Sequence, residues 1–206
     1  MHIAVLLFDG MTALDAVGPL EVLARVPDVE VSLIAKRRGV QRCGVRSGGL
    51  GLEATRELGE VDACDVLVIP GGVVARQWVD DQAVVGWISK LHPKTRYTTS
   101  VCTGSLLLGA AGVLRGLRAT THWSAREQLA SFGATVVTDR VVMEGKVITA
   151  AGVSSGIDMA LALAAKLTDE DTARAIQLQI EYDPQPPFDS GCFETASDSI
   201  KQRLAN

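Results

Sequence analysis

The sequence predicts a single α/β domain in which a mainly parallel β-sheet is covered by helices on both faces. Three observations support this fold class. Short apolar runs typical of buried strands alternate along the chain with segments of helical periodicity. The 206 residues are enough for one good-sized core and few for two independent domains. Apolar residues make up 47% of the chain and charged residues 21%, which is a globular balance.

The first part of the chain is expected to supply three strands of the sheet. Residues 3–8 (I-A-V-L-L-F) form a continuous apolar run that ends in a D-G turn, and a helical pattern follows from about 14 to 26. Residues 29–35 alternate in polarity, as a strand does. Residues 65–72 (D-V-L-V-I-P-G-G) are a buried strand that ends in a glycine pair. The Gly-rich stretch 40–52 has short β character and suggests an edge hairpin.

The second part continues the alternation of helices and strands. Ser154 and Ser155 precede an apolar helical run, so we expect them to cap that helix. The prolines that follow residue 182 cannot continue a helix and should end the last one. The expected elements, in order, are a helix at about 80–91, a strand at 96–101, helices at 103–114 and 123–131, short strands with an E-G-K turn within 135–150, and helices at 155–167 and 169–181.

Composition argues against several function classes. A net charge of -4 and a pI near 5.4 argue against a nucleic-acid or anionic membrane surface. The apolar run at the N-terminus is typical of a strand and not of a signal peptide, and no stretch approaches the ~18 apolar residues of a membrane span. The cysteines are scattered and form no C-x-x-C pair. We therefore expect a reduced, cytoplasmic protein without a metal. The four cysteines are Cys43, Cys64, Cys102 and Cys192.

Cys102 stands where the strand 96–101 gives way to the next helix. Ligands of open parallel sheets bind at the carboxyl ends of the strands, so this is a favoured place for chemistry. The positive end of a helix can lower a thiol pKa from ~8.5 to ~3.5–7.5, which predicts a thiolate at neutral pH. The small residues Thr103, Gly104 and Ser105 permit close approach around the turn. On position alone, a small buried hydrophobic residue is an equally good interpretation.

A nucleophile needs a proton partner, and two side chains are candidates. Asp15 follows the first strand and therefore lies at the same edge of the sheet, although an ordinary helix N-cap would explain it equally well. His122, in A-T-T-H-W, follows a strand-like segment and is a candidate to reach the same edge of the sheet. The other two histidines, His2 and His92, are expected at the surface.

Six segments together resemble the ThiJ/PfpI superfamily (the DJ-one superfamily), and within it the isonitrile hydratase branch. The resemblance implies a fold like that of class I glutamine amidotransferases and flavodoxin, with the cysteine on a strand-to-helix nucleophile elbow. It also implies one domain over 1–206 whose tail, from about 183, packs on the body or on a dimer partner. The segments are L-D-A-V-G-P-L-E-V, V-L-V-I-P-G-G, S-V-C-T-G-S-L-L-L-G-A-A-G-V-L, R-A-T-T-H-W, I-T-A-A-G-V-S-S-G-I-D and Q-L-Q-I-E-Y-D-P-Q-P-P-F.

The resemblance assigns roles to particular residues. Cys102 is the implied nucleophile, and Asp15 the acidic residue that shares a proton with it. The peptidase-like branch has histidine directly after the cysteine, where this chain has Thr103, so proteolysis is not expected. The implied reaction hydrates an isonitrile to a formamide through a cysteine thioimidate, without cofactor. Backbone N–H groups of Gly72 and Thr103 are expected to stabilise the thiolate and developing charge.

The same resemblance suggests a pocket, an assembly and two rival functions. The pocket candidates are Gly71, His122, Trp123, Gly152 and Val153, with Trp78 as a further suggestion. A homodimer acting on a small-molecule isonitrile is expected. One rival is a non-catalytic sensing domain like those of AraC-type regulators, although the chain ends too soon after its last helix for a DNA-binding unit. The other is a stress or repair protein of glyoxalase type that uses the same thiol.

Overall fold

The computed structural model describes residues 1–44 and 49–204. At its centre is a seven-stranded sheet in the order β10-β11-β7-β6-β1-β2-β5. All neighbouring strands are parallel except β10 and β11, which are antiparallel. The predicted mainly parallel sheet is confirmed. Its strands are β1 (His2–Leu6), β2 (Glu30–Ala35), β5 (Arg56–Glu57), β6 (Val66–Ile69), β7 (Tyr97–Val101), β10 (Val141–Glu144) and β11 (Val147–Ala150).

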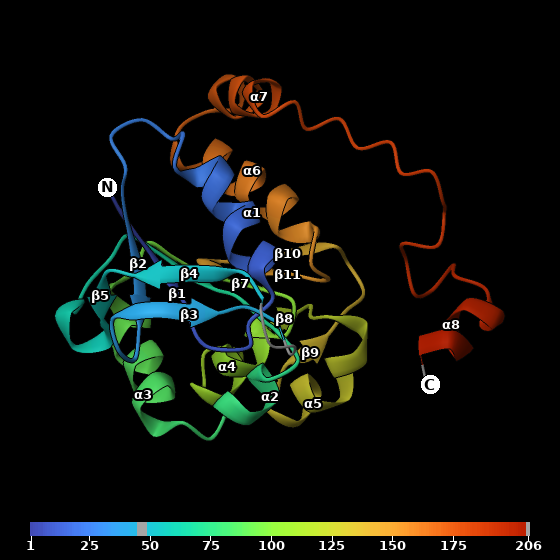
Figure 1. Cartoon of the computed structure of the whole chain (residues 1–206), viewed down its shortest axis with the longest axis horizontal. Coiled ribbons are helices and arrows are strands. Elements are labelled where there is room, and N and C mark those ends of the chain that lie inside the picture. The colour runs from blue at the N-terminus through green and yellow to red at the C-terminus, as the bar shows by residue number, and fades with distance from the viewer. Residues whose placement is uncertain (45–48, 205–206) are drawn as a thin grey trace.

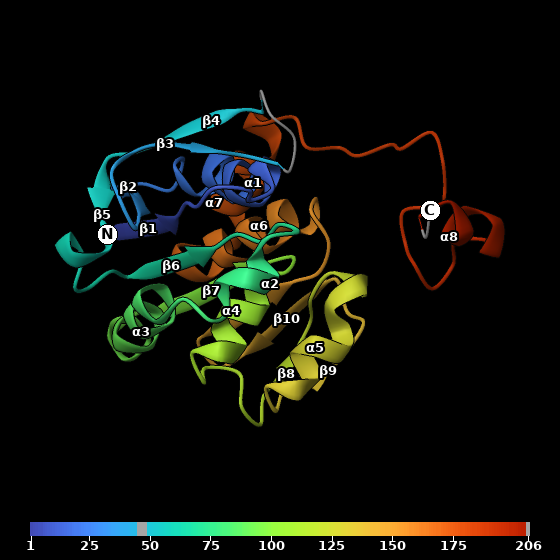
Figure 2. The same cartoon turned by 60° about the horizontal axis from the view of Figure 1, so that its bottom comes forward.

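Helices cover both faces of this sheet, as Figures 1 and 2 show. One face carries α1 (Ala13–Leu23) and α6 (Ser155–Leu167), with α7 (Glu170–Gln179) packed outside α6. The other face carries α2 (Ala75–Trp78), α3 (Gln82–Leu91), α4 (Gly104–Ala110) and α5 (Arg126–Ser131). A long extended segment then leads to α8 (Asp198–Leu204), which lies beside the body in Figure 1. Within the described residues, no helix has the length and apolar content to cross a membrane.

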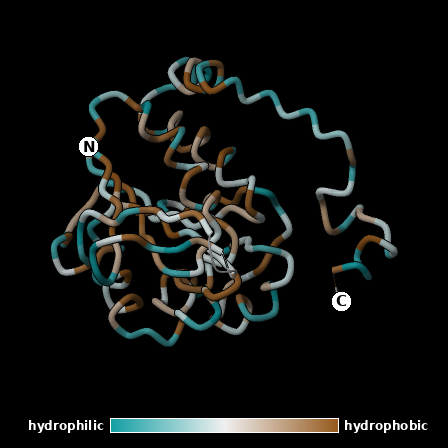
Figure 3. The backbone as a smooth tube through the Cα atoms, viewed as in Figure 1, coloured by the Kyte–Doolittle hydropathy of each residue, from teal (hydrophilic) through white to brown (hydrophobic). Residues whose placement is uncertain are grey.

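The central strands are buried because they are covered on both faces. Every residue of β6, and Ile3–Leu6 of β1, is at most 1% exposed. A strand buried in this way has a continuous apolar run and not an alternating one. In Figure 3 the brown, hydrophobic backbone gathers in the body, whereas the segment after α7 is mostly teal to white.

Two further strand pairs lie outside the main sheet. Strands β3 (Gly39–Arg42) and β4 (Gly51–Ala54) are antiparallel, which confirms the suggested hairpin, while its connection at 45–48 lies outside the described residues. Strands β8 (Arg118–Ala119) and β9 (Thr135–Val136) form a short parallel pair. The E-G-K turn is confirmed between β10 and β11.

Three sequence expectations differ from the structure. The helix expected over 103–114 ends at Ala110, because the chain turns at Gly112, whose φ is +76°. Neither the four-residue α2 nor the C-terminal α8 was expected, so the helix predicted at 169–181 is not the last one. The serines do not cap α6: Ser154 is the N-cap residue, but its side chain makes no capping hydrogen bond and instead accepts one from Arg140 at 3.2 Å.

Candidate active site

Cys102 occupies a strained turn directly after β7. Its φ is +57°, a left-handed conformation that non-glycine residues rarely adopt and that costs free energy unless the surroundings hold it. Its N–H donates to the carbonyl of Ala150 at 3.0 Å. Its carbonyl accepts from the hydroxyls of Thr121 at 3.1 Å and Ser105 at 3.2 Å. These three bonds from β11, the T-T-H-W segment and α4 hold the turn in place.

Asp15 lies in the first turn of α1 and is completely buried. The N-cap residue of α1 is Thr12, so the N-cap interpretation of Asp15 is wrong. One carboxyl oxygen, Oδ2, accepts from the N–H of Gly71 at 3.0 Å. The Cys102 thiol lies close enough to the same carboxyl group to lower its pKa. The other oxygen, Oδ1, is buried and has no further partner among the described residues.

The fold therefore brings together two acidic groups from distant segments of the sequence, one after β1 and one after β7. Burial is the largest influence on both. It raises the pKa of Asp15 from 3.8 to about 7, against the opposing effects of the Gly71 N–H and the Cys102 thiol. Burial, followed by the charge of Asp15, raises the pKa of the Cys102 thiol to about 12. Between pH of about 7 and about 12 the pair holds one proton.

This result corrects the expectation of a Cys102 thiolate with a lowered pKa. A helix end contributes roughly 0.3–1 kcal/mol, which is less than one pKa unit. Burial can shift a pKa by up to about 3–5 units. The cysteine is only 5% exposed and faces a carboxyl group, so the effect of burial is the larger one.

The turn around Cys102 is tied to the end of β6. The Thr103 hydroxyl donates to the carbonyl of Gly72 and accepts from its N–H, both at 2.8 Å. The Gly72 N–H is therefore occupied and does not serve as the expected thiolate donor. The Thr103 N–H does face the sulfur and lowers its pKa.

Gly71 and Gly104 allow this close approach. A Cβ on Gly71 would lie 2.5 Å from the nitrogen of Thr103, and one on Gly104 would lie 2.2 Å from the carbonyl oxygen of Ile69. Both distances are too short for any side chain. The absence of a side chain at Gly71 and at Gly104 therefore lets the end of β6 lie directly against the turn that leads into α4, while the Gly71 N–H binds Asp15.

Four of the suggested pocket residues line one cavity of about 390 Å³: His122, Trp123, Gly152 and Val153. Thr121 also lines it and connects it to the Cys102 turn through the bond described above. Trp78 does not line it, because its ring packs on Phe8 with centroids 5.2 Å apart, and the fifth candidate, Gly71, does not line it either. Cys102 and Asp15 are not among the lining residues, although Leu14, the neighbour of Asp15, is one of them.

The histidines take no direct part in the Cys102–Asp15 pair. His122 Nδ1 shares a hydrogen bond with the Ser124 hydroxyl at 2.9 Å, and burial followed by the charges of Arg76 and Arg126 lowers its pKa below 6.5. It is therefore neutral at pH 7. His2 and His92, which were expected at the surface, are only partly exposed, and they lie at the amino-terminal edge of the sheet, opposite the site.

Sequence reasoning missed several lining residues. Thr121 was within a quoted segment, but only His122 and Trp123 of that segment were considered. Arg126, Arg140 and residues 191–194 also line the cavity, and no local pattern marks them.

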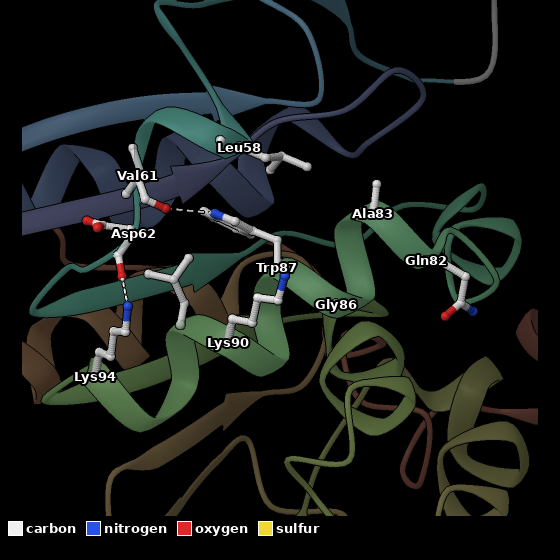
Figure 4. A pocket seen from close by; sticks show the side chains of 11 residues that line it. Leu58, Val61, Asp62, Gln82, Ala83, Gly86, Trp87, Lys90 and Lys94 are labelled. Carbon is white, nitrogen blue, oxygen red and sulfur yellow. Dashed lines mark hydrogen bonds between the residues drawn. The ribbon is translucent and has the colours of Figure 1, made fainter.

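A second cavity, shown in Figure 4, is separate from this site. It lies between η1 (Leu58–Glu60) and α3, and its walls are tied by internal bonds. The Trp87 indole donates to the carbonyl of Val61 at 2.9 Å, and Lys94 donates to that of Asp62 at 2.7 Å. None of the site residues lines it.

Comparisons with known proteins show the family and the fold of the chain. The model of the DJ-1/PfpI family matches residues 1–166. The isonitrile hydratase of Pseudomonas putida is 44% identical over 200 residues, which are 97% of this chain and 86% of that protein. The crystal structure of a ThiJ/PfpI family protein from Pseudomonas syringae has a TM-score of 0.94 at 36% identity, covering 98% of this chain and 84% of the other. Oxidized DJ-1 of Toxoplasma gondii shares the fold, with a TM-score of 0.77 at 23% identity over 89% of this chain and 99% of the other.

Proposed function

The chain belongs to the DJ-1/PfpI family, and on that premise we propose that it is an isonitrile hydratase, which adds water to R–N≡C and releases the formamide R–NH–CHO. The observation that carries the proposal is the buried Cys102–Asp15 pair, which holds a single proton above pH of about 7. The terminal carbon of an isonitrile must gain both a nucleophile and a proton. A thiol and a carboxylate that share a proton supply both.

The first step adds the S–H bond of Cys102 across the terminal carbon. Asp15, as a carboxylate, takes the thiol proton and passes it to that carbon, whose lone pair forms the C–H bond. Sulfur forms the C–S bond, and one π pair moves to nitrogen. The product is the thioimidate R–N=CH–S–Cys102, and Asp15 is again a carboxylate.

The second step adds water to the thioimidate. Asp15 takes a proton from water while the oxygen bonds to carbon, and it returns the proton to nitrogen. It then takes the hydroxyl proton as the C=O bond forms and the C–S bond breaks. The proton returns to sulfur, so the formamide leaves and the pair is restored. The carboxyl oxygen without a partner among the described residues, Oδ1, is the one available for these transfers.

Formamide production tests the proposal directly. The purified protein is incubated with cyclohexyl isonitrile, and N-cyclohexylformamide is measured by mass spectrometry. We expect multiple turnovers by the wild type and none by Cys102→Ala. Methylglyoxal is the comparison substrate: its consumption in place of the isonitrile would favour the stress-protein alternative and reject the hydratase.

A cytoplasmic homodimer completes the proposal. Leu178 and Phe188 are each 81% exposed, and a second copy would cover such apolar side chains. Light scattering at micromolar concentration should report twice the 21.8 kDa chain mass. A single mass of one chain would reject the dimer and leave the reaction unaffected.

A further inference from the structure

The C-terminal tail reaches the cavity that Thr121 connects to the turn at Cys102. After α7 the chain runs extended and exposed through residues 183–190, and residues 191–194 then line the cavity. Phe193 stacks on Trp123 with ring centroids 4.5 Å apart and planes at 13°. The ammonium group of Lys201, on α8, lies 5.1 Å from the centre of the Phe193 ring. The tail thus adds the ring of Phe193 to the cavity wall, next to the ring of Trp123 from the body.

The tail also changes the charge of the cavity. Two guanidinium groups line it, from Arg126 and Arg140. Arg140 is paired with Asp158 of α6, and Arg126 is paired with Glu194 of the tail. Bonds from Arg126 and from the Cys192 thiol lower the pKa of Glu194 to about 2, so it is a carboxylate at any working pH.

The body supplies the carboxylate that pairs with Arg140, and the tail supplies the carboxylate that pairs with Arg126. With Glu194 in place, both guanidinium groups of the described lining are matched by carboxylates. Without it, Arg126 would present an unmatched positive charge to the cavity. When Glu194 pairs with Arg126, the cavity suits an uncharged substrate. If Arg126 were unpaired, the cavity would suit an anionic substrate.

We propose that residues 193 and 194 complete the substrate pocket and make it select uncharged isonitriles with an apolar ring. Phe193, with Trp123, forms the surface against which the ring packs, and Glu194 positions and neutralises Arg126. This inference rests on the proposed function, because it concerns which isonitriles reach the same Cys102. Phe193 and Glu194 are specificity residues and have no part in the proton transfers.

The first test compares kcat/KM for cyclohexyl isonitrile and for isocyanoacetate, which carries a carboxylate. Glu194→Gln should lower the preference for the neutral substrate by about tenfold, the effect of one charge left unmatched. Glu194→Asp should retain the wild-type preference. Phe193→Ala should lower the preference for cyclohexyl over methyl isonitrile by about tenfold. Matched controls are Val40→Ala on the exposed strand β3 and Glu170→Gln on α7, which should leave both preferences unchanged.

The second test needs no isonitrile. Iodoacetate and iodoacetamide are nearly the same size, and only the former is charged. Their relative rates of alkylation at Cys102 are measured by peptide mapping at pH of about 9, where more of the thiol is ionised. Glu194→Gln should raise the iodoacetate rate relative to iodoacetamide, and Glu170→Gln should not.

The two tests separate the two claims. If the wild type hydrates no isonitrile but Glu194→Gln shifts the alkylation ratio, the proposed function fails and the assignment of the tail stands. If isonitriles are hydrated and neither ratio shifts in the Glu194 and Phe193 variants, the assignment of the tail is overturned and the hydratase stands.

Discussion

Replacing Asp15 with asparagine separates the role of this side chain in stability from its role in chemistry. Raising the pKa of a carboxyl from 3.8 to about 7 means that the folded protein resists its ionisation. Below pH 3.8 the group is protonated in both states and has no effect. Between pH 3.8 and about 7 the unfolded chain ionises first, so the free energy of unfolding falls as the pH rises. At ~1.4 kcal/mol per pKa unit, the ionised group destabilises the fold by about 4 kcal/mol above this range.

An asparagine in place of Asp15 would keep the shape and could still accept the Gly71 N–H, but it cannot ionise. Asp15→Asn should therefore leave stability nearly unchanged at pH of about 4 and increase it by up to about 4 kcal/mol at pH of about 8. Turnover should fall by roughly 10²–10⁴, the usual effect of losing a general acid–base group. Urea unfolding at both pH values and steady-state formamide production measure the two effects. Equal stability changes at the two pH values, or near wild-type turnover, would refute the reasoning.

Four further changes probe the same site. The value of kcat/KM should rise about tenfold per pH unit below pH 7 and level off above it, as Asp15 becomes a carboxylate; a flat profile from pH of about 5 to 8 would remove it as the base. Cys102→Ser should keep the melting temperature within a few degrees and abolish formamide formation; residual turnover would point to another nucleophile. Gly71→Ala places a Cβ 2.5 Å from a backbone nitrogen and should destabilise the fold by roughly 1–3 kcal/mol, whereas Gly86→Ala, which meets open space, should not. Limiting iodoacetamide at neutral pH should label the exposed Cys192 before the buried Cys102; the reverse order would contradict the raised thiol pKa.

The sequence was most informative where the local pattern and the buried position agree. Strands β1 and β6 are covered on both faces, so their continuous apolar runs predict them well. The convergence of Asp15 and Cys102 followed from one rule, since both come after parallel strands. The four-residue α2 is too short to show a helical period, and the prediction missed it for that reason.

The electrostatics and the tail were beyond sequence reasoning. The pKa of Cys102 depends on how completely α1, β6, α4 and β11 exclude water, which no local pattern reports. The placement of Phe193 against Trp123 depends on the path of an irregular, Pro-rich segment with no apolar period. Its contacts are set by ring packing and one ion pair, so they follow from the tertiary structure alone.

The burial of Cys102 also bears on how durable the sulfur is. With a pKa of about 12, the thiol on its own is ionised in on the order of one molecule in 10⁵ at pH 7. Peroxides and alkyl halides react with the thiolate form, so we expect both to react slowly with Cys102 at neutral pH. In the proposed mechanism an isonitrile differs, because its carbon accepts the proton that Asp15 removes from the thiol. In the proposed mechanism the substrate thus takes up the shared proton, whereas an alkyl halide, which accepts no proton, finds the sulfur protected.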